Sequence, residues 1–213
     1  MFVGHYGPAA AAAGRRIKLW HGFVAVQFLD ILWAPFVLLG FEHVRIVERF
    51  TASNHFDLYH MPWTHSLVMA LVWSVLAGVV YNALRKGGGI VIGALVFSHW
   101  ILDFITHKPD LELWFGGPKV GLALWDNRPL AVSLEFALLI VGLAMYLART
   151  KAKGVAGAAA PFVLLALLAA AQLFGNFGPA PADGREAAMS AIIAYAVFAV
   201  LAAIVDATRA PKR

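Results

Sequence analysis

Long apolar runs alternate with short polar stretches along most of the chain. Apolar segments of about 20 residues with almost no charge are typical of membrane-spanning helices. Near the start, "PAAAAAGRRIKLW" predicts a short helix that a basic turn joins to the first apolar run. We therefore expect a short N-terminal helix followed by six membrane spans. The predicted spans are 18–40, 62–84, 88–107, 129–149, 158–175 and 187–206.

The composition supports the same fold class. Of the 213 residues, 61% are hydrophobic and only 14% are charged, whereas soluble domains carry about a quarter charged residues. We expect an all-α, polytopic membrane helix bundle that forms one domain over 1–213. Its motif-bearing part is 1–128, and 129–213 supplies Ala/Leu-rich supporting helices. The chain has no cysteine, which excludes disulfides and thiolate metal sites.

The basic residues are distributed unequally between the two ends of the predicted spans. Cytoplasmic loops carry an excess of Lys and Arg, so this asymmetry predicts the orientation. We expect both termini in the cytoplasm and the polar stretches 41–61 and 108–128 outside. The net charge of +5 then reflects helix ends, and we expect no nucleic-acid partner. The richer side has Arg15, Arg16, Lys18, Arg85, Lys86, Arg149, Lys151, Lys153, Arg209, Lys212 and Arg213, and the other has Arg45, Arg49, Lys108, Lys119, Arg128 and Arg185.

Several apolar segments carry an ionisable residue at a similar predicted depth. A buried carboxylate in a membrane is costly and needs a partner or a polar cavity. Several carboxylates in one layer would repel one another, and either protonation or a divalent cation would relieve that repulsion. With a rise of about 1.5 Å per residue from the basic turns, one layer at about 16–22 Å contains His5, Asp30, His99, Asp103 and Glu135.

Two local patterns within these segments favour metal chemistry. His99 and Asp103 are four residues apart, so one helix face can present both to a metal, or one can orient the other. A helix-packing hydrogen bond is the alternative. In "HMPWTHSL", Pro62 suits a first helical turn, which places His60 outside the helix and His65 inside it. His65 is then a metal ligand, an acid–base group or an interfacial anchor.

Simpler interpretations remain for the other candidates. His5 is also consistent with a solvated chain end, Asp30 with a packing hydrogen bond, and Glu135 with an ion pair to an outer loop. Residues on or beside the outer loops are candidates for contacting a substrate headgroup, although ordinary interfacial chemistry explains them equally well. These candidates are His60, His107, Lys119 and Trp125.

The motifs "HMPWTHSL" and "SHWILDFIT" resemble those of bacterial inner-membrane proteins grouped as metal-dependent hydrolases. The resemblance covers about residues 1–128, includes an early histidine at His5, and implies a hydrolytic reaction in the bacterial inner membrane. The family's "PDxD" motif is replaced by "QFLD", which ends at Asp30 and lacks the second acid. The order of His5, Asp30, His65 and the His99–Asp103 pair is also similar, more loosely, to that of zinc-dependent phospholipases C.

Two classes of function follow from these patterns. The first is a hydrolase of a lipid or small amphiphilic ester or phosphoester at the outer leaflet. A divalent metal, zinc by its donor set, would be bound by His5, Asp30, His99 and Asp103, with His65 or Glu135 transferring the proton. The second is a proton- or ion-coupled permease, because intramembrane Asp, Glu and His also form ion pathways. A non-catalytic membrane scaffold is a further alternative, and the oligomeric state is left open.

Overall fold

A computed structural model describes residues 1–212 of the chain. Helices dominate it, and the few strands are short. The elements in chain order are η1 (Val3–His5), α1 (Tyr6–Ala12), α2 (Leu19–Val26), α3 (Phe28–Leu38), β1 (His43–Ile46), β2 (Phe56–His60), α4 (Leu67–Arg85), α5 (Gly89–Thr106), β3 (Leu111–Glu112), β4 (Lys119–Val120), η2 (Leu124–Asp126), α6 (Arg128–Arg149), β5 (Thr150–Ala152), α7 (Val155–Phe177), α8 (Gly184–Thr208) and β6 (Arg209–Pro211).

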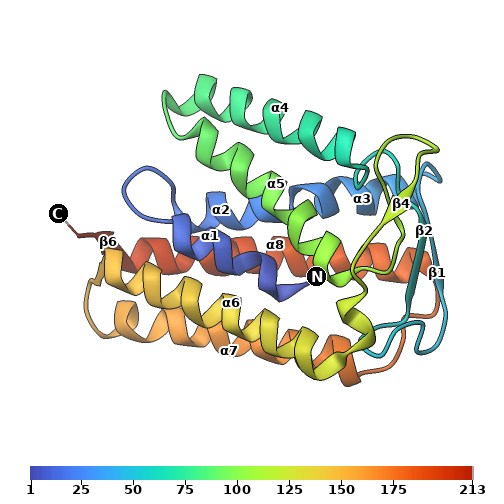
Figure 1. Cartoon of the computed structure of the whole chain (residues 1–213). Helices are drawn as coiled ribbons and strands as arrows, with labels where there is room; N and C mark the ends of the chain where they lie inside the picture. The colour runs from blue at the N-terminus through green and yellow to red at the C-terminus, as the bar shows by residue number, and fades with distance from the viewer. Residues whose placement is uncertain (213) are drawn as a thin grey trace.

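The long helices form an elongated bundle of membrane-spanning length. The helices α4 to α8 are each long and apolar enough to cross a membrane, and the bent pair α2–α3 makes a sixth candidate span. Figure 1 shows α4 and α5 as one hairpin, α6 and α7 as another, and α1, α2, α3 and α8 between them. Apolar side chains point outward, as for Val75, which is 66% exposed. The chain is thus a multi-pass, all-α membrane protein, as predicted.

The first predicted span is broken near its middle. Helices α2 and α3 meet at Gln27, which leaves helical geometry at φ −103° and ψ 9°, and their axes differ by 48°. A break frees backbone groups, and inside a membrane these must find partners within the protein. The carbonyl of Val26, the last residue of α2, lies 2.6 Å from Nδ1 of His99. The break therefore places a hydrogen-bond acceptor next to a predicted site residue.

The prediction that Pro62 opens the second span is wrong. Pro62 lies in a turn, and α4 begins at Leu67 with Ser66 as its N-cap. The Ser66 hydroxyl accepts from the Met69 amide at 3.3 Å, the arrangement that stabilises a helix start. His65 consequently lies before the helix, where its direction is set by the turn instead of by helical periodicity.

The short N-terminal helix lies within the bundle, against α6 (Figure 1). Gly7 allows this close contact, because a Cβ at that position would lie 2.5 Å from the Leu138 carbonyl oxygen. The Glu135 carboxylate on α6 accepts from the Phe2 amide at 3.2 Å and from the Gly4 amide at 2.8 Å. Small residues and a buried carboxylate thus fix the first turn of the chain at mid-bundle.

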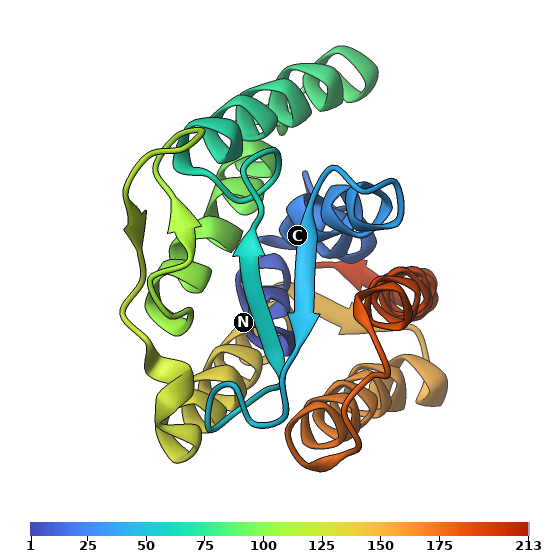
Figure 2. The ribbon, with the colours of Figure 1, turned by 90° about the vertical axis from the view of Figure 1, so that its right-hand side faces the viewer.

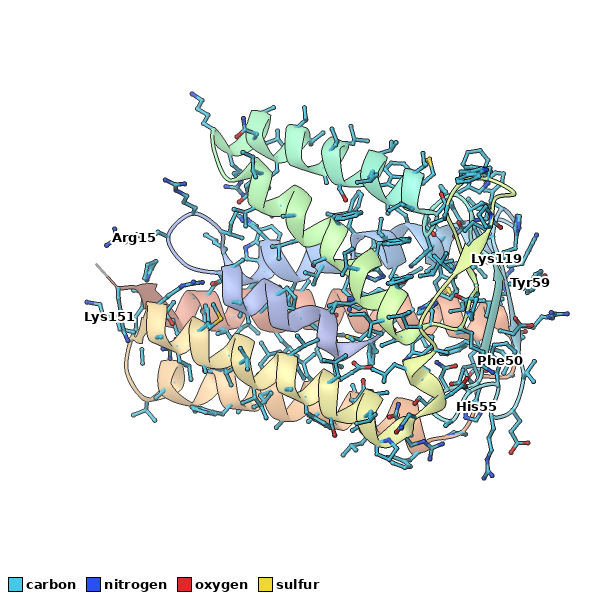
Figure 3. The ribbon with its side chains drawn as sticks, viewed as in Figure 1. Arg15, Phe50, His55, Tyr59, Lys119 and Lys151 are labelled. Carbon is cyan, nitrogen blue, oxygen red and sulfur yellow. The ribbon has the colours of Figure 1, made fainter. Side chains whose placement is uncertain are left out.

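The two ends of the bundle differ in structure. The hairpin of β1 and β2 crosses one end of the bundle (Figure 2), with Arg45 and Asp57 paired at 2.6 Å. The two-stranded β3–β4 ladder lies at the same end, so both long polar stretches contain strands that the sequence analysis did not predict. We call this the loop end. In Figure 3, Phe50, His55, Tyr59 and Lys119 lie at the loop end, and Arg15 and Lys151 lie at the opposite end.

Candidate metal centre

Buried histidines and aspartates from four separate segments converge inside the bundle. Two groups of potential ligand atoms each lie within 4.8 Å of one another: His5, His99 and Asp103 form one, and Asp30, His65 and His99 form the other. His99 belongs to both groups, so together they make one site. We call these five residues the His/Asp cluster. The cluster contains the four residues that the sequence analysis proposed as metal ligands, His5, Asp30, His99 and Asp103, together with His65.

His99 and Asp103 extend from one face of α5 into the cluster. The Nδ1 of His99 donates to the Val26 carbonyl, since a carbonyl oxygen can only accept, and this leaves the lone pair on Nε2. That Nε2 lies 3.0 Å from Asp103 Oδ2. The helix ends at Thr106, three residues before Pro109, which cannot continue a helix. His107 therefore has extended backbone geometry and turns back beside Asp103.

His65 is oriented by a chain of hydrogen bonds that begins at Glu42. The Thr64 hydroxyl donates to Glu42 Oε2 at 2.7 Å. Its one proton is then used, so the Thr64 hydroxyl oxygen accepts from His65 Nδ1 at 2.7 Å. The amides of Trp63 and Thr64 also donate to Glu42. Burial raises the pKa of Glu42, although Thr64 and His65 oppose the rise. As in His99, the lone pair of His65 is on Nε2 and faces the cluster.

Two imidazole nitrogens lie close to one oxygen each of Asp30 and Asp103. His65 Nε2 lies 3.3 Å from both His99 Nε2 and Asp30 Oδ1. Asp103 Oδ2 lies 3.0 Å from His99 Nε2 and 3.7 Å from His65 Nε2. His99 Nε2 and Asp30 Oδ1 are 3.7 Å apart. Bonds of about 2.0–2.1 Å to a tetrahedral zinc would separate its ligand atoms by about 3.4 Å. The observed distances of 3.0–3.7 Å are near that value, so the donors present are suited to a divalent ion held by imidazole nitrogen and carboxylate oxygen.

The charges of the cluster, like its distances, favour a cation between the donor atoms. Two imidazole lone pairs, on His65 and His99, face each other at 3.3 Å with both ring protons committed elsewhere. Two nearby carboxylates, Asp30 and Asp103, face the same space. The two facing lone pairs repel each other unless a metal ion or an added proton lies between them.

Asp103 also connects the site to the first turn of the chain. Its Oδ1 lies 3.2 Å from His5 Nε2 and 2.5 Å from the Met1 amino group. The His5 ring stacks on His99, with centroids 3.8 Å apart and planes 4° from parallel. His5 is completely buried, so the structure excludes the alternative of a solvated terminus. His5 Nε2 faces Asp103 Oδ1, whereas His65 and His99 face the other carboxylate oxygen, Oδ2. The role of His5 as a ligand stays a prediction.

Two further hydrogen bonds orient side chains at the cluster, one to Asp30 and one from His107. The Tyr195 hydroxyl on α8 donates to Asp30 Oδ2 at 2.6 Å, which leaves Oδ1 toward His65. His107 donates from Nδ1 to Asp110 Oδ1 at 2.9 Å, and its Nε2 lies 3.4 Å from Asp103 Oδ1. Burial lowers the pKa of His107, but Asp110 and Asp103 outweigh it and raise the pKa to about 9.

The His/Asp cluster opens into a largely apolar cavity of about 480 Å³, which we call the cluster cavity. Helices α7 and α8, predicted to be supporting elements, form much of its wall. Four of its lining residues carry buried polar atoms without a protein partner among residues 1–212, namely Trp33 Nε1, Asn54 Nδ2, Gln172 Oε1 and Asn176 Oδ1. Such atoms are costly unless they bond to a ligand or water. The cavity is therefore suited to a molecule with a polar portion and an apolar portion.

The structure separates the other predicted site residues into two sets. His107, Trp125 and Glu135 line the cluster cavity, and His107 stacks on Trp125 with centroids 4.2 Å apart. His60 instead stacks on His43 in the hairpin, and Lys119 donates to the Tyr59 carbonyl at the loop-end surface (Figure 3). Neither lines the cavity. Their roles in substrate binding, and that of Glu135 in proton transfer, stay predictions.

Sequence reasoning missed three residues that orient the cluster: Glu42, Thr64 and Tyr195. Thr64 was part of a quoted motif, but its hydroxyl had no assigned role. A signal for Glu42 was its position as an acid between apolar segments, which the many charges of the stretch 41–61 obscured. Tyr195 lies in an otherwise Ala/Leu-rich span, and nothing in its spacing indicated Asp30 as a partner.

Comparison with protein-family models, with curated proteins and with solved structures finds no match to this chain. The resemblance of the two motifs to membrane metal-dependent hydrolases therefore stays a prediction. The site must be interpreted from its own geometry.

Proposed function

We propose that this protein is a membrane-embedded, metal-dependent hydrolase. Its substrate would be a lipid or small amphiphilic ester or phosphoester, reached from the outer leaflet of a bacterial inner membrane. The observation that carries the proposal is the convergence of donor atoms from Asp30, His65, His99 and Asp103 beside an apolar cavity. This set replaces His5 of the sequence-based ligand set with His65, which the sequence left open as a ligand.

The donor types favour zinc among the divalent metals. Two imidazoles and two carboxylates are ordinary zinc ligands, and a membrane interior without thiolates leaves no softer set. When held by three of these four donors, zinc would keep a fourth position for a water of lowered pKa, and it would polarise the scissile bond. Glu42 and Thr64 then act through His65, and Tyr195 acts through Asp30, by holding these ligands in position.

The remaining chemistry belongs to residues that line the cavity. His107 has carboxylates at both ring nitrogens and a raised pKa, so its Nε2 would give a proton at the edge of the cluster and take it back afterwards. Glu135 was the sequence candidate for this step, and its carboxylate is engaged by the Phe2 and Gly4 amides. In this proposal His107 moves the proton, and Glu135 anchors the first turn. The apolar cavity excludes bulk water from the reacting group.

Metal content tests the proposal directly. Protein purified in detergent without added metal, and the same protein after supplementation with zinc, is analysed for its divalent metals. We expect about one ion per chain in the wild type. Asp103→Ala and Asp103→Asn should both lose it, because a neutral amide is a poorer ligand and does not balance the ion's charge. Asp126→Asn, an exposed loop acid, is the matched control and should retain the ion.

The same measurement distinguishes the two classes of function. In a proton- or ion-coupled permease, Asp103→Asn would resemble the protonated carrier, and wild type and variant would be equally free of metal. A wild-type protein that contains no divalent ion, and gains none on supplementation, would refute the hydrolase. If the ion is present, hydrolysis of phospholipid esters in mixed micelles, abolished by chelation and restored by zinc, then tests the reaction itself.

A further inference from the structure

A second cavity of about 480 Å³ lies at the loop end, beside the cluster cavity. Its polar wall is formed by Glu48, Arg49, His55 and Arg128, and we call it the arginine pocket. His55, Asn176, Pro179 and Ala180 line both cavities, so the two share a wall. A molecule in the cluster cavity therefore has a cationic pocket adjacent to it.

Arg128 and Arg49 differ in how they are held, but each guanidinium has N–H groups without a hydrogen-bond acceptor among residues 1–212. Arg128 donates from Nε to the Ala52 carbonyl, and its guanidinium lies over the Phe177 ring with 5.1 Å to the centroid. These contacts fix the guanidinium while its two terminal nitrogens have no hydrogen bond to residues 1–212. Arg49 makes no side-chain hydrogen bond or ion pair within that range, and its backbone has φ +54°, which is uncommon for a non-glycine residue.

His55 adds a donor to this wall. The Arg49 amide donates to His55 Nδ1 at 2.9 Å, so Nδ1 is the acceptor nitrogen and Nε2 carries the proton. Glu48 is the acid among the residues of the pocket, which leaves two positive charges against one negative charge. Guanidinium groups with unsatisfied donors in one pocket are suited to bind phosphate and other oxyanions.

We propose that the arginine pocket binds the phosphate-class anionic headgroup of an amphiphile whose apolar part occupies the neighbouring cluster cavity. This assignment names the substrate class of the proposed hydrolase. Only the cleavage of that substrate rests on the hydrolase proposal. Binding itself requires Arg49 and Arg128 and does not require the His/Asp cluster to contain an ion.

The test measures binding without metal. Protein in detergent with excess chelator is titrated calorimetrically with dihexanoyl phosphatidic acid, with dihexanoyl phosphatidylcholine and with inorganic phosphate. We expect the phosphatidic acid to bind at least tenfold more tightly than the phosphatidylcholine, with an affinity that falls as salt rises. The double variant Arg49→Gln/Arg128→Gln should remove that preference. Arg185→Gln, which removes an exposed loop-end arginine outside the pocket, should keep it.

A second variant separates binding from folding. Arg49→Glu changes an exposed side chain without partners in the described chain, so it should unfold at the wild-type temperature and still lose at least tenfold in affinity for the phosphatidic acid. Unchanged affinity in Arg49→Glu, or equal binding of the two lipids by wild type, would overturn the proposal. Inorganic phosphate that binds as tightly as the phosphatidic acid would keep the anion site and overturn its assignment to a lipid. Because chelator is present throughout, none of these outcomes depends on whether the hydrolase proposal survives.

Discussion

The hydrogen bond made by Nδ1 of His65 and of His99 determines how each imidazole takes part in the His/Asp cluster. Nδ1 of His99 is committed to a main-chain carbonyl, and Nδ1 of His65 is committed to Thr64. Each bond fixes which nitrogen carries the proton, and both lone pairs then face the same small volume. The ability of the cluster to bind a metal thus depends also on residues that do not themselves supply a ligand atom. Thr64, which bonds to His65 Nδ1, is the clearest example.

Replacing Thr64 by valine should weaken metal binding about 10- to 100-fold, because it removes the acceptor for His65 Nδ1 and the link to Glu42 while keeping the side-chain shape. Competition of the purified protein with a zinc chelator measures the change. Thr64→Ser should restore most of the affinity. Thr106→Val is the control, because that buried hydroxyl bonds only to carbonyls of its own helix. Equal affinity in Thr64→Val and wild type would remove the positioning role.

At the scale of elements, the site depends on two departures from simple spanning helices. The break between α2 and α3 supplies the Val26 carbonyl to His99, and the buried helix α1 brings His5 against Asp103. The α1 helix has only Tyr6–Ala12, which is too short to be stable alone. Its position follows from close packing on α6 and from the amide hydrogen bonds to Glu135.

Gly7→Val should therefore displace α1 and destabilise the protein by about 1–3 kcal/mol, since its Cβ would meet the Leu138 backbone at 2.5 Å. The melting temperature in detergent, followed by tryptophan fluorescence, reports the loss. Gly14→Ala is the matched control, because the nearest heavy atom to a Cβ there is 3.9 Å away. A Gly7→Val protein with wild-type stability would show that the tight contact of α1 with α6 is not required.

The whole molecule has its chemistry inside and its apolar surface outside. Asp103 is 2% exposed at the centre of the bundle, whereas Val79 on α4 is 61% exposed. This distribution suits a lipid environment, in which the membrane covers the apolar faces and the protein supplies every polar partner. Both cavities lie toward the loop end, so the orientation of the bundle decides which leaflet supplies a ligand.

Cysteine labelling in intact cells tests that orientation, and the native chain has no cysteine to interfere. Tyr59 and Lys151 lie at opposite ends of the bundle (Figure 3), and both are exposed. The charge asymmetry predicts that an impermeant thiol reagent labels Tyr59→Cys from outside and labels Lys151→Cys only after the cells are opened. The reverse pattern would place both cavities at the cytoplasmic leaflet.

The sequence alone was sufficient for the helix bundle, and it predicted that several ionisable groups share one level along the helices. Length and hydropathy determine a membrane span because the bilayer has a fixed thickness, so the spans beginning near Gly89 and Arg128 were predicted to within about two residues. The rise per residue of a helix then places His99, Asp103 and Glu135 in one layer without any knowledge of their neighbours.

The assembled structure decided which of those groups meet, and through which atoms. Hydropathy is symmetric around a helix axis in lipid, so it contains no information on the angle at which one helix faces another. The turn before α4, the break at Gln27 and the packing of α8 on α3 are what turn His65, His99 and Asp30 toward one point. Hydrogen bonds between distant segments, such as Glu42 with Thr64 and Tyr195 with Asp30, exist only after the chain has folded. For this protein, the position of each group along its helix follows from the sequence, whereas the geometry of the His/Asp cluster follows from the tertiary structure.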